Sequence, residues 1–196
     1  MALVHAKSAA ITNLDASPPV RNTSGEGGHG HLIYNETTIA VVGQADALST
    51  YSLFRVPSNA CLKFIDFSSP SQGATGIFNI GAYYGPDGPA GLTVTPPTVA
   101  GVSVIDEDFF AQALDTDAGT GVLAHLVPGS GFVLTNATPA QYVNDTWLAS
   151  MANKRLWDAL GLTVDPRCSI DIVANAVEAI ATGTVSIYAA IGYVLL

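Results

Sequence analysis

The stretch TVSIYAAIGYVL, residues 184–195, decides the fold class of this sequence. It is rich in β-branched and aromatic residues, which strands favour. Apolar residues occupy every second position from Val185 onward, and alternate side chains of a strand lie on the same face. The opposite face also carries Tyr188, Ala190 and Val194. We therefore expect a strand that is covered on both sides.

Strand-like runs of the same kind occur in the rest of the chain, at residues 37–42, 51–56, 61–67, 77–84 and 168–173. Only a short turn at Ser58 and Asn59 separates the second of these runs from the third, so we expect those two to form a hairpin. The runs do not alternate regularly with helices, as they would in a parallel sheet. The sequence therefore predicts an all-β fold, an antiparallel β-sandwich or jelly roll.

Two short helices are expected beside the strands. Residues 106–114 (DEDFFAQAL) place acidic side chains in a first turn, where the helix dipole favours them, and their apolar residues follow a helical spacing. Residues 153–160 (NKRLWDAL) begin with Asn153 as an N-cap and are followed by Gly161, which favours the end of a helix.

The first 31 residues differ in character from the rest. Residues 15–31 (DASPPVRNTSGEGGHGH) are dense in Pro, Gly, Ser and Asn, which exclude a helix or a central strand. We expect residues 1–31 to be an extended N-terminal arm that becomes ordered on a neighbouring molecule, with an unstructured terminus as the alternative. Residues 32–196 are then the β-sandwich domain.

Nucleic acid and a membrane are both unexpected partners, the first because of the charge composition and the second because of the pattern of apolar residues. Charged residues make up 12% of the chain, the formal net charge is −9, and the seven basic residues are scattered. A protein that binds nucleic acid needs a clustered basic face, so we expect no direct contact with nucleic acid. No run of about 18 uninterrupted apolar residues is present, so we expect no membrane span. The N-terminus does not resemble a signal peptide, which favours synthesis in a cytoplasm.

The two cysteines, Cys61 and Cys168, lie in strand-like runs. We expect them to be small buried hydrophobic residues rather than a disulfide framework.

The sequence offers only weak candidates for metal-binding or catalytic residues. Glu26, His29 and His31 have a spacing that could offer ligands to a metal, but they lie in the stretch with the most flexible composition, so we expect no metal site. The acidic group 106–108 is explained by a helix N-terminus. No nucleophile elbow and no phosphate-binding loop occurs, so we expect neither an enzyme nor a cofactor.

Several segments together resemble small virion proteins of tailed bacteriophages, specifically the capsid cement or decoration proteins. They follow one another in the same order as in that family and span most of the chain: LVHAKSAAITNLDASPPVRNTSGEG (3–27), TYSLFRVPSNACLKFIDF (50–67), GIFNIGAYYGPDG (76–88), VIDEDFFAQAL (104–114), KRLWDALGL (154–162) and ATGTVSIYAAIGYV (181–194). The resemblance implies β-sandwich subunits, commonly homotrimers, that bind the outside of the major capsid protein shell and hold neighbouring capsomers together.

We therefore expect a non-enzymatic structural protein, made in the host bacterial cytoplasm and located on the capsid surface of the virion. Its partners would be copies of itself and the major capsid protein. The alternative is a carbohydrate-binding jelly-roll module of a phage tail or spike, with Trp147, Trp157 and tyrosines lining a groove. The interface residues that we expect lie on the arm and just after it: Val20, Arg21, Asn22, His29, His31 and Tyr34.

Overall fold

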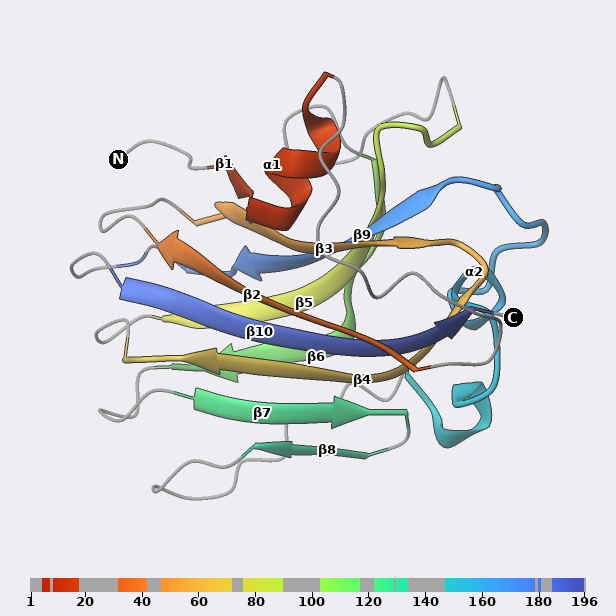
Figure 1. Cartoon of the computed structure of the whole chain (residues 1–196). Coiled ribbons are helices and arrows are strands. Elements are labelled where there is room, and N and C mark those ends of the chain that lie inside the picture. The colour runs from red at the N-terminus through yellow and green to blue at the C-terminus, as the bar shows by residue number, and fades with distance from the viewer. Residues whose placement is uncertain are drawn as a thin grey trace.

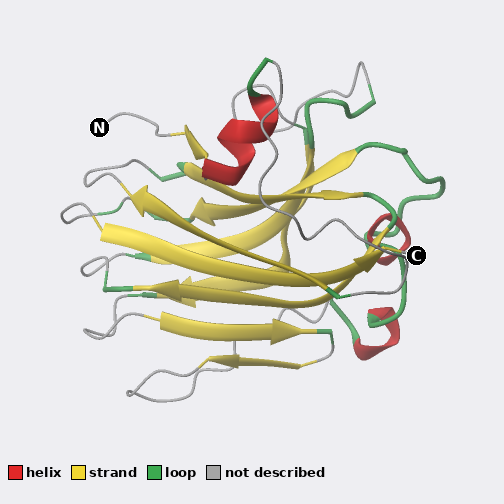
Figure 2. Cartoon of the chain, in the orientation of Figure 1, coloured by secondary structure: helices red, strands yellow, loops and turns green. Residues whose placement is uncertain are grey.

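Two five-stranded sheets packed face to face make up the fold (Figures 1 and 2). The computed structural model describes residues 5–7, 9–17, 32–41, 47–71, 76–89, 103–116, 122–128, 130–133, 147–178, 180 and 185–195. Within these ranges strands predominate and helices are short. The prediction of an all-β sandwich is confirmed, while the jelly-roll connectivity stays a prediction.

The first sheet has the order β1-β3-β9-β5-β6. Its strands are β1 (His5–Lys7), β3 (Thr50–Pro57), β9 (Ser169–Ala176), β5 (Ile77–Tyr84) and β6 (Val104–Asp115). All its neighbours pair antiparallel except β1 and β3, which are parallel.

The second sheet has the order β2-β10-β4-β7-β8 and is antiparallel throughout its described pairs. Its strands are β2 (Ile33–Val41), β10 (Val185–Leu195), β4 (Ala60–Ser69), β7 (Val122–Val127) and β8 (Ser130–Val133). It is the nearer sheet in Figure 1.

The core lies between the sheets and joins them in one apolar cluster. Ile187 and Ile191 of β10 are fully buried there, together with Phe67 of β4 and Phe78 of β5, whose rings are 5.8 Å apart. The inward face expected for the closing run is thus confirmed. Its outward face is mixed, because Ala190 is buried whereas Tyr188 is exposed, so the expectation of full coverage on both sides is wrong at that position.

The predicted hairpin between residues 51–56 and 61–67 is wrong. These residues form β3 and β4, which belong to different sheets: β3 pairs with β9, and β4 pairs with β10 and β7. The turn between them crosses from one sheet to the other, and Ser58 anchors it. The Ser58 N–H donates to the Cys168 carbonyl at 2.9 Å, and the Ser58 carbonyl accepts from the Trp157 N–H at 3.1 Å. A short polar turn suits either geometry, so the local sequence does not distinguish them.

The helix predicted over residues 106–114 is also wrong, because this segment is strand β6. Its pairing with β5 shifts register several times, so that Phe109, Phe110 and Ala111 are all buried in succession. Ala113 has a φ of 51°, and its N–H donates to the Asn79 side-chain oxygen at 2.8 Å. Such irregularities remove the period of two that identifies a strand, and the remaining pattern imitates a helix.

The helices that do occur are α1 (Ala9–Asp15), the 3-10 helix η1 (Ala149–Met151) and α2 (Leu156–Ala159). The last lies within the predicted range 153–160 and buries Leu156 and Ala159, so a helix there is confirmed. The expected cap at Asn153 is wrong, because the helix begins after Arg155 and has no side-chain cap. Among the described residues, none of the helices has the length and apolar character needed to cross a membrane.

Part of the predicted arm has regular structure. Residues 5–7 form β1 beside β3, and α1 buries Ile11. Residues 18–31 lie outside the described residues, and the division into an arm and a domain at residue 31 stays a prediction.

Both cysteines are free and buried, as expected. Burial, and then the nearby carboxylates of Asp87 and Asp165, raise the pKa of the Cys168 thiol to about 11. The thiol therefore stays protonated and unreactive at neutral pH.

Candidate functional site

Most of the site residues expected from the sequence fall outside the described part of the chain. This holds for Val20, Arg21, Asn22, Glu26, His29 and His31. Tyr34 is described: it lies on β2 and its side chain is 51% exposed. Among the described residues, no group of three or more His, Cys, Asp or Glu side chains is arranged to hold a metal ion.

Tyr34 belongs to an exposed surface on the outer side of the second sheet. We call this surface the aromatic–acidic face and define it by six residues: Tyr34, Glu36, Phe64, Asp66, His125 and Tyr188. They come from four adjacent strands, β2, β10, β4 and β7. Sequence reasoning pointed to Tyr34 alone, because the other five come together only when those strands pair.

Strand register arranges the face in rows. Tyr34 on β2 and Phe64 on β4 are both opposite Gly192 of β10. In the next row, Glu36 and Asp66 are both opposite Ala190. The central strand thus contributes its smallest side chains where its neighbours contribute rings and carboxylates.

The side chains of the face contact one another. The Tyr188 hydroxyl donates to Glu36 Oε2 at 3.1 Å and lies 3.3 Å from the Tyr34 hydroxyl. The Phe64 ring lies 6.2 Å from the Tyr34 ring and stacks on the His125 imidazole at 5.8 Å. The hydrogen bond with Tyr34, partial desolvation and the hydrogen bond to Glu36 raise the pKa of Tyr188. Tyr188 is therefore neutral at physiological pH and remains a hydrogen-bond donor.

The face carries two carboxylates, Glu36 and Asp66. Asp66 pairs with His125 Nδ1, and its side chain is 31% exposed. Glu36 accepts from the Tyr188 hydroxyl and, at 3.4 Å, from the Tyr34 hydroxyl. Within the described residues, neither carboxylate forms an ion pair with a lysine or arginine. The face is thus negative and partly aromatic.

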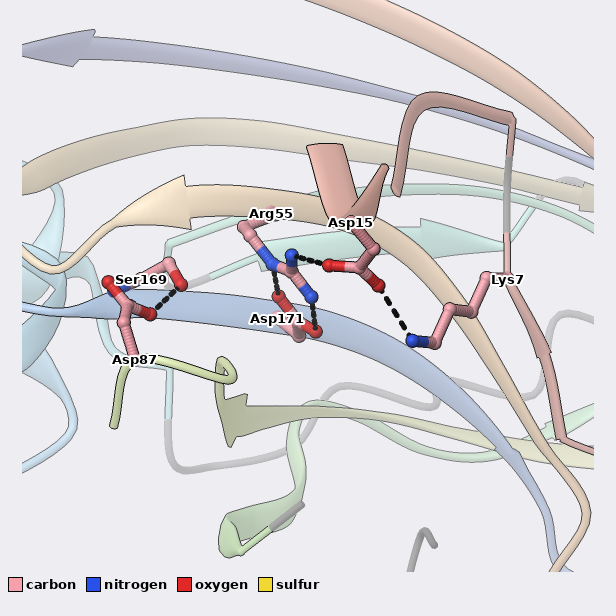
Figure 3. Close-up of polar contacts among 6 residues, drawn as sticks. All are labelled: Lys7, Asp15, Arg55, Asp87, Ser169 and Asp171. Carbon is pink, nitrogen blue, oxygen red and sulfur yellow. Dashed lines mark hydrogen bonds and ion pairs between the residues drawn. The ribbon is translucent and has the colours of Figure 1, made fainter. Parts of the chain in front are cut away.

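In the first sheet, charged side chains instead form ion pairs that connect β1 and α1 to the sheet (Figure 3). Arg55 of β3 lies directly opposite Asp171 of β9 and donates to both of its carboxylate oxygens, at 2.7 and 2.9 Å. Arg55 also pairs with Asp15 of α1, which accepts from Lys7 of β1 at 2.7 Å. Burial alone would lower the pKa of Arg55, but the two carboxylates outweigh it and raise that pKa. Arg55 therefore stays charged and links β1 and α1 to the sheet.

A serine hydrogen-bonded to a carboxylate lies near this network. The Ser169 hydroxyl and N–H both donate directly to Asp87 (Figure 3). The pair connects the residues after β5 to the start of β9.

The acidic group Asp106, Glu107 and Asp108 lies on strand β6 and not at a helix N-terminus. The helix dipole therefore does not explain it. Desolvation, followed by the hydrogen bond and repulsion from Asp106, raises the pKa of Asp108 to about 6. Gln112 donates to the Asp108 carboxylate at 2.8 Å. Asp106 and Glu107 crowd their negative charges around Asp108, and this repulsion costs stability when Asp108 is ionised.

We expect Asp108→Asn to raise the free energy of unfolding by about 1 kcal/mol at pH 7, after allowance for solvent screening. Because the pKa of Asp108 is higher in the folded state, the native protein binds more protons between pH 4 and 6, and its stability falls as pH rises through that window. Urea denaturation at pH 7 and pH 4 measures both effects.

The variant should lose that part of the pH dependence and match the wild type near pH 4. Glu178→Gln, at an exposed position after β9, serves as the matched control and should change little at either pH. Equal stabilities of Asp108→Asn and wild type at pH 7 would contradict the raised pKa.

A solved structure from a bacteriophage capsid has a similar fold. A chain in the capsid of Ralstonia phage GP4 matches 100% of this chain over 99% of its own length, with a TM-score of 0.52 and 14% sequence identity. A chain of the cyanophage Pam1 capsid asymmetric unit is 15% identical, with a TM-score of 0.44 over 93% of this chain and 97% of that one. No protein-family model matches the sequence, and no curated protein matches it.

Proposed function

We propose that this chain is a non-enzymatic virion structural protein that binds the outside of a bacteriophage capsid shell and stabilises it, as a cement or decoration protein. The similarity of its whole length to a chain of the Ralstonia phage GP4 capsid is the observation that carries the proposal. The low charged fraction of 12% supports it, because weakly charged surface suits a protein that is buried in an assembly. In this proposal the chain acts as a homotrimer on the major capsid protein.

Capsid shells that lack the protein test this proposal. We expect the purified chain to co-sediment with such shells, to saturate at a fixed number of copies per capsomer, and to raise the temperature at which the shells break. Many copies on one particle turn modest affinities into stable attachment. If the chain stays in the supernatant with intact shells, the proposal is wrong.

The residues proposed to contact the shell or a neighbouring copy are Val20, Arg21, Asn22, His29, His31 and Tyr34. Deleting the whole arm would be a poor test, because it would also remove β1 and α1 with Ile11 and the Asp15–Arg55 ion pair. Replacing residues 18–31 by a Gly-Ser sequence of equal length keeps those contacts.

We expect that replacement to weaken shell binding by about tenfold or more, since it removes the side chains proposed to make the contacts. Thermal unfolding of the isolated protein should be unchanged, which separates loss of contact from loss of fold. Unchanged binding would remove the arm from the proposal while leaving the shell-binding role in place.

The alternative, a carbohydrate-binding module of a tail or spike, relied in part on two tryptophans. Trp147 is 3% exposed and packs edge-on against Phe110, with ring centres 5.0 Å apart, so it does not line an open groove. Within the described part of the chain, the exposed aromatic residues are instead Tyr34 and Tyr188. A glycan array with the purified protein decides between the two functions.

A further inference from the structure

We infer that the irregular part of β6 binds a calcium ion through the carboxylates of Asp106 and Asp108, with side-chain oxygens of Gln112 and Tyr83 beside them. The inference goes beyond the proposed function and does not depend on it, because it follows from the pairing of β5 with β6. Bound calcium would join the two strands at the edge of the first sheet.

The first step of the argument is the local shape of β6. Its register against β5 shifts at Gly81, and residues 107–110 form a bulge there. The bulge lies directly on Gly81, where an added Cβ would be 2.3 Å from the Glu107 carbonyl oxygen. Asp106 and Asp108 meet at this bulge: their carboxyl groups are within hydrogen-bonding distance of each other, and Asp106 Oδ1 accepts from the Asp108 N–H at 3.2 Å. Bulges re-aim side chains in this way and are frequent beside functional sites.

The second step is the set of oxygen atoms. Gln112 Nε2 donates to Asp108 Oδ2 at 2.8 Å, and rotation of the amide brings its oxygen to the same place. Asp106 and Asp108 are partly exposed and Gln112 is exposed, so an ion reaches them from solvent. Calcium takes about six to eight oxygen ligands from carboxylates, amide carbonyls and water, in flexible geometry. The bulge offers the protein part of such a set.

The third step, which points to a ligand, is the hydroxyl of Tyr83. Tyr83 is fully buried, and its hydroxyl has no hydrogen-bond partner among the described residues. Burial, followed by the charges of Glu107, Asp106 and Asp108, raises the pKa of Tyr83, so the hydroxyl lies beside the acidic group. A buried hydroxyl without a partner costs free energy and is rare in native proteins. An ion held by the two aspartates supplies that partner, directly or through one of its water ligands.

The fourth step selects the ion. Zinc and copper favour histidine and cysteine, whereas these side chains offer oxygen alone. Magnesium demands nearly ideal octahedral geometry, which an irregular bulge does not provide. The described residues contain no group of three or more His, Cys, Asp or Glu side chains arranged for a metal ion, and this site instead combines two carboxylates with neutral oxygens. We therefore expect weak binding, with a Kd of about 0.1–1 mM.

Calcium chloride alone is the probe for the test. At about 5 mM and neutral pH it should raise the Tm of the full chain by about 4 °C, because only the folded chain assembles the site. Sodium chloride at equal ionic strength should leave the Tm unchanged, and magnesium chloride should raise it less than calcium does.

Two conservative variants locate the effect. Asp108→Asn should be more stable than the wild type without calcium, for the reason given above, and should gain almost nothing when calcium is added. Tyr83→Phe keeps the buried ring and should fold as stably as the wild type without calcium, but its calcium-dependent rise in Tm should be about half as large or smaller. A hydroxyl that served only the packing of the sheet would not change the response to calcium.

Glu178→Gln is the matched control, because it removes one exposed carboxylate outside the site and should respond to calcium as the wild type does. A wild-type Tm that calcium does not change, an equal rise with sodium chloride, or an undiminished rise in Asp108→Asn or Tyr83→Phe would overturn the inference. None of these outcomes bears on shell binding, so the proposed function is tested separately.

Discussion

Replacing Arg55 by methionine is expected to lower the free energy of unfolding by about 3–5 kcal/mol at neutral pH, the usual cost of removing one partner from a buried ion pair. Asp171 is only 2% exposed and receives two hydrogen bonds from the guanidinium. Methionine fills similar space but leaves that carboxylate buried without its cation. The variant also loses the ion pair that fastens α1 to β3 through Asp15.

The pH dependence of the stability of Arg55→Met shows whether the unpaired Asp171 carboxylate causes the loss. Burial already raises the pKa of Asp171, even though Arg55 opposes the shift. Without Arg55 the pKa rises further, so the folded variant takes up a proton more readily than the unfolded chain. Its stability therefore falls as pH rises above about 4, and the deficit relative to wild type is largest at neutral pH and shrinks toward pH 4. Urea denaturation across this range measures the deficit.

Two further variants control for other effects. Lys7→Met removes an exposed partner of Asp15 and should cost less than about 1 kcal/mol. Arg55→Met/Asp171→Leu removes both buried charges and should recover much of the lost stability. A double variant as unstable as Arg55→Met alone would show that packing, and not the unpaired carboxylate, explains the loss.

The second large effect is expected at Gly81 of β5, where alanine should lower the free energy of unfolding by about 3 kcal/mol. An added Cβ would lie 2.3 Å from the Glu107 carbonyl oxygen and 2.5 Å from that of Asp106. These are backbone atoms of β6, which cannot move without disturbing its pairing with β5. Urea denaturation measures the loss, and hydrogen exchange should show that amides of β5 and β6 open first.

Gly192→Ala is the matched comparison, since its added Cβ also meets an atom at 2.2 Å. That atom belongs to the Phe64 ring, which is half-buried at the surface and can rotate toward solvent. We therefore expect a loss of only about 1 kcal/mol. Equal losses for the two glycine variants would contradict the distinction between a backbone obstacle and a mobile side chain.

The local pattern of apolar residues was sufficient to identify the regular strands. β5, β9 and β10 have near-alternating or continuous apolar runs, and their positions follow from the sequence. A helix at α2 was also predictable, from its apolar face and from Gly161 after it, although its N-cap is Arg155 and not Asn153. β6 was not, because its pairing with β5 shifts register and buries consecutive residues. Helix α1 was missed because its seven residues carry no acidic first turn and no basic last turn.

The candidate site was predictable only in part. Tyr34 is an expected interface residue that the structure places on an exposed face, whereas Phe64, Asp66, His125 and Tyr188 gave no signal. Those residues lie far apart in the chain and become neighbours through the register of β2, β10, β4 and β7.

The sequence by itself determined that this chain is mostly β, that its cysteines are buried, and where most of its long strands run, because alternation of apolar side chains is a local property. The tertiary structure alone decided which strands pair, which side of the turn at Ser58 belongs to which sheet, and which charges are buried. These depend on contacts between distant segments, whose free energies are absent from any local pattern. Arg55 and Asp171, and Glu36 and Asp66, are equally ordinary residues in the sequence, and only the folded structure buries the first pair as an ion pair and leaves the second pair at the surface.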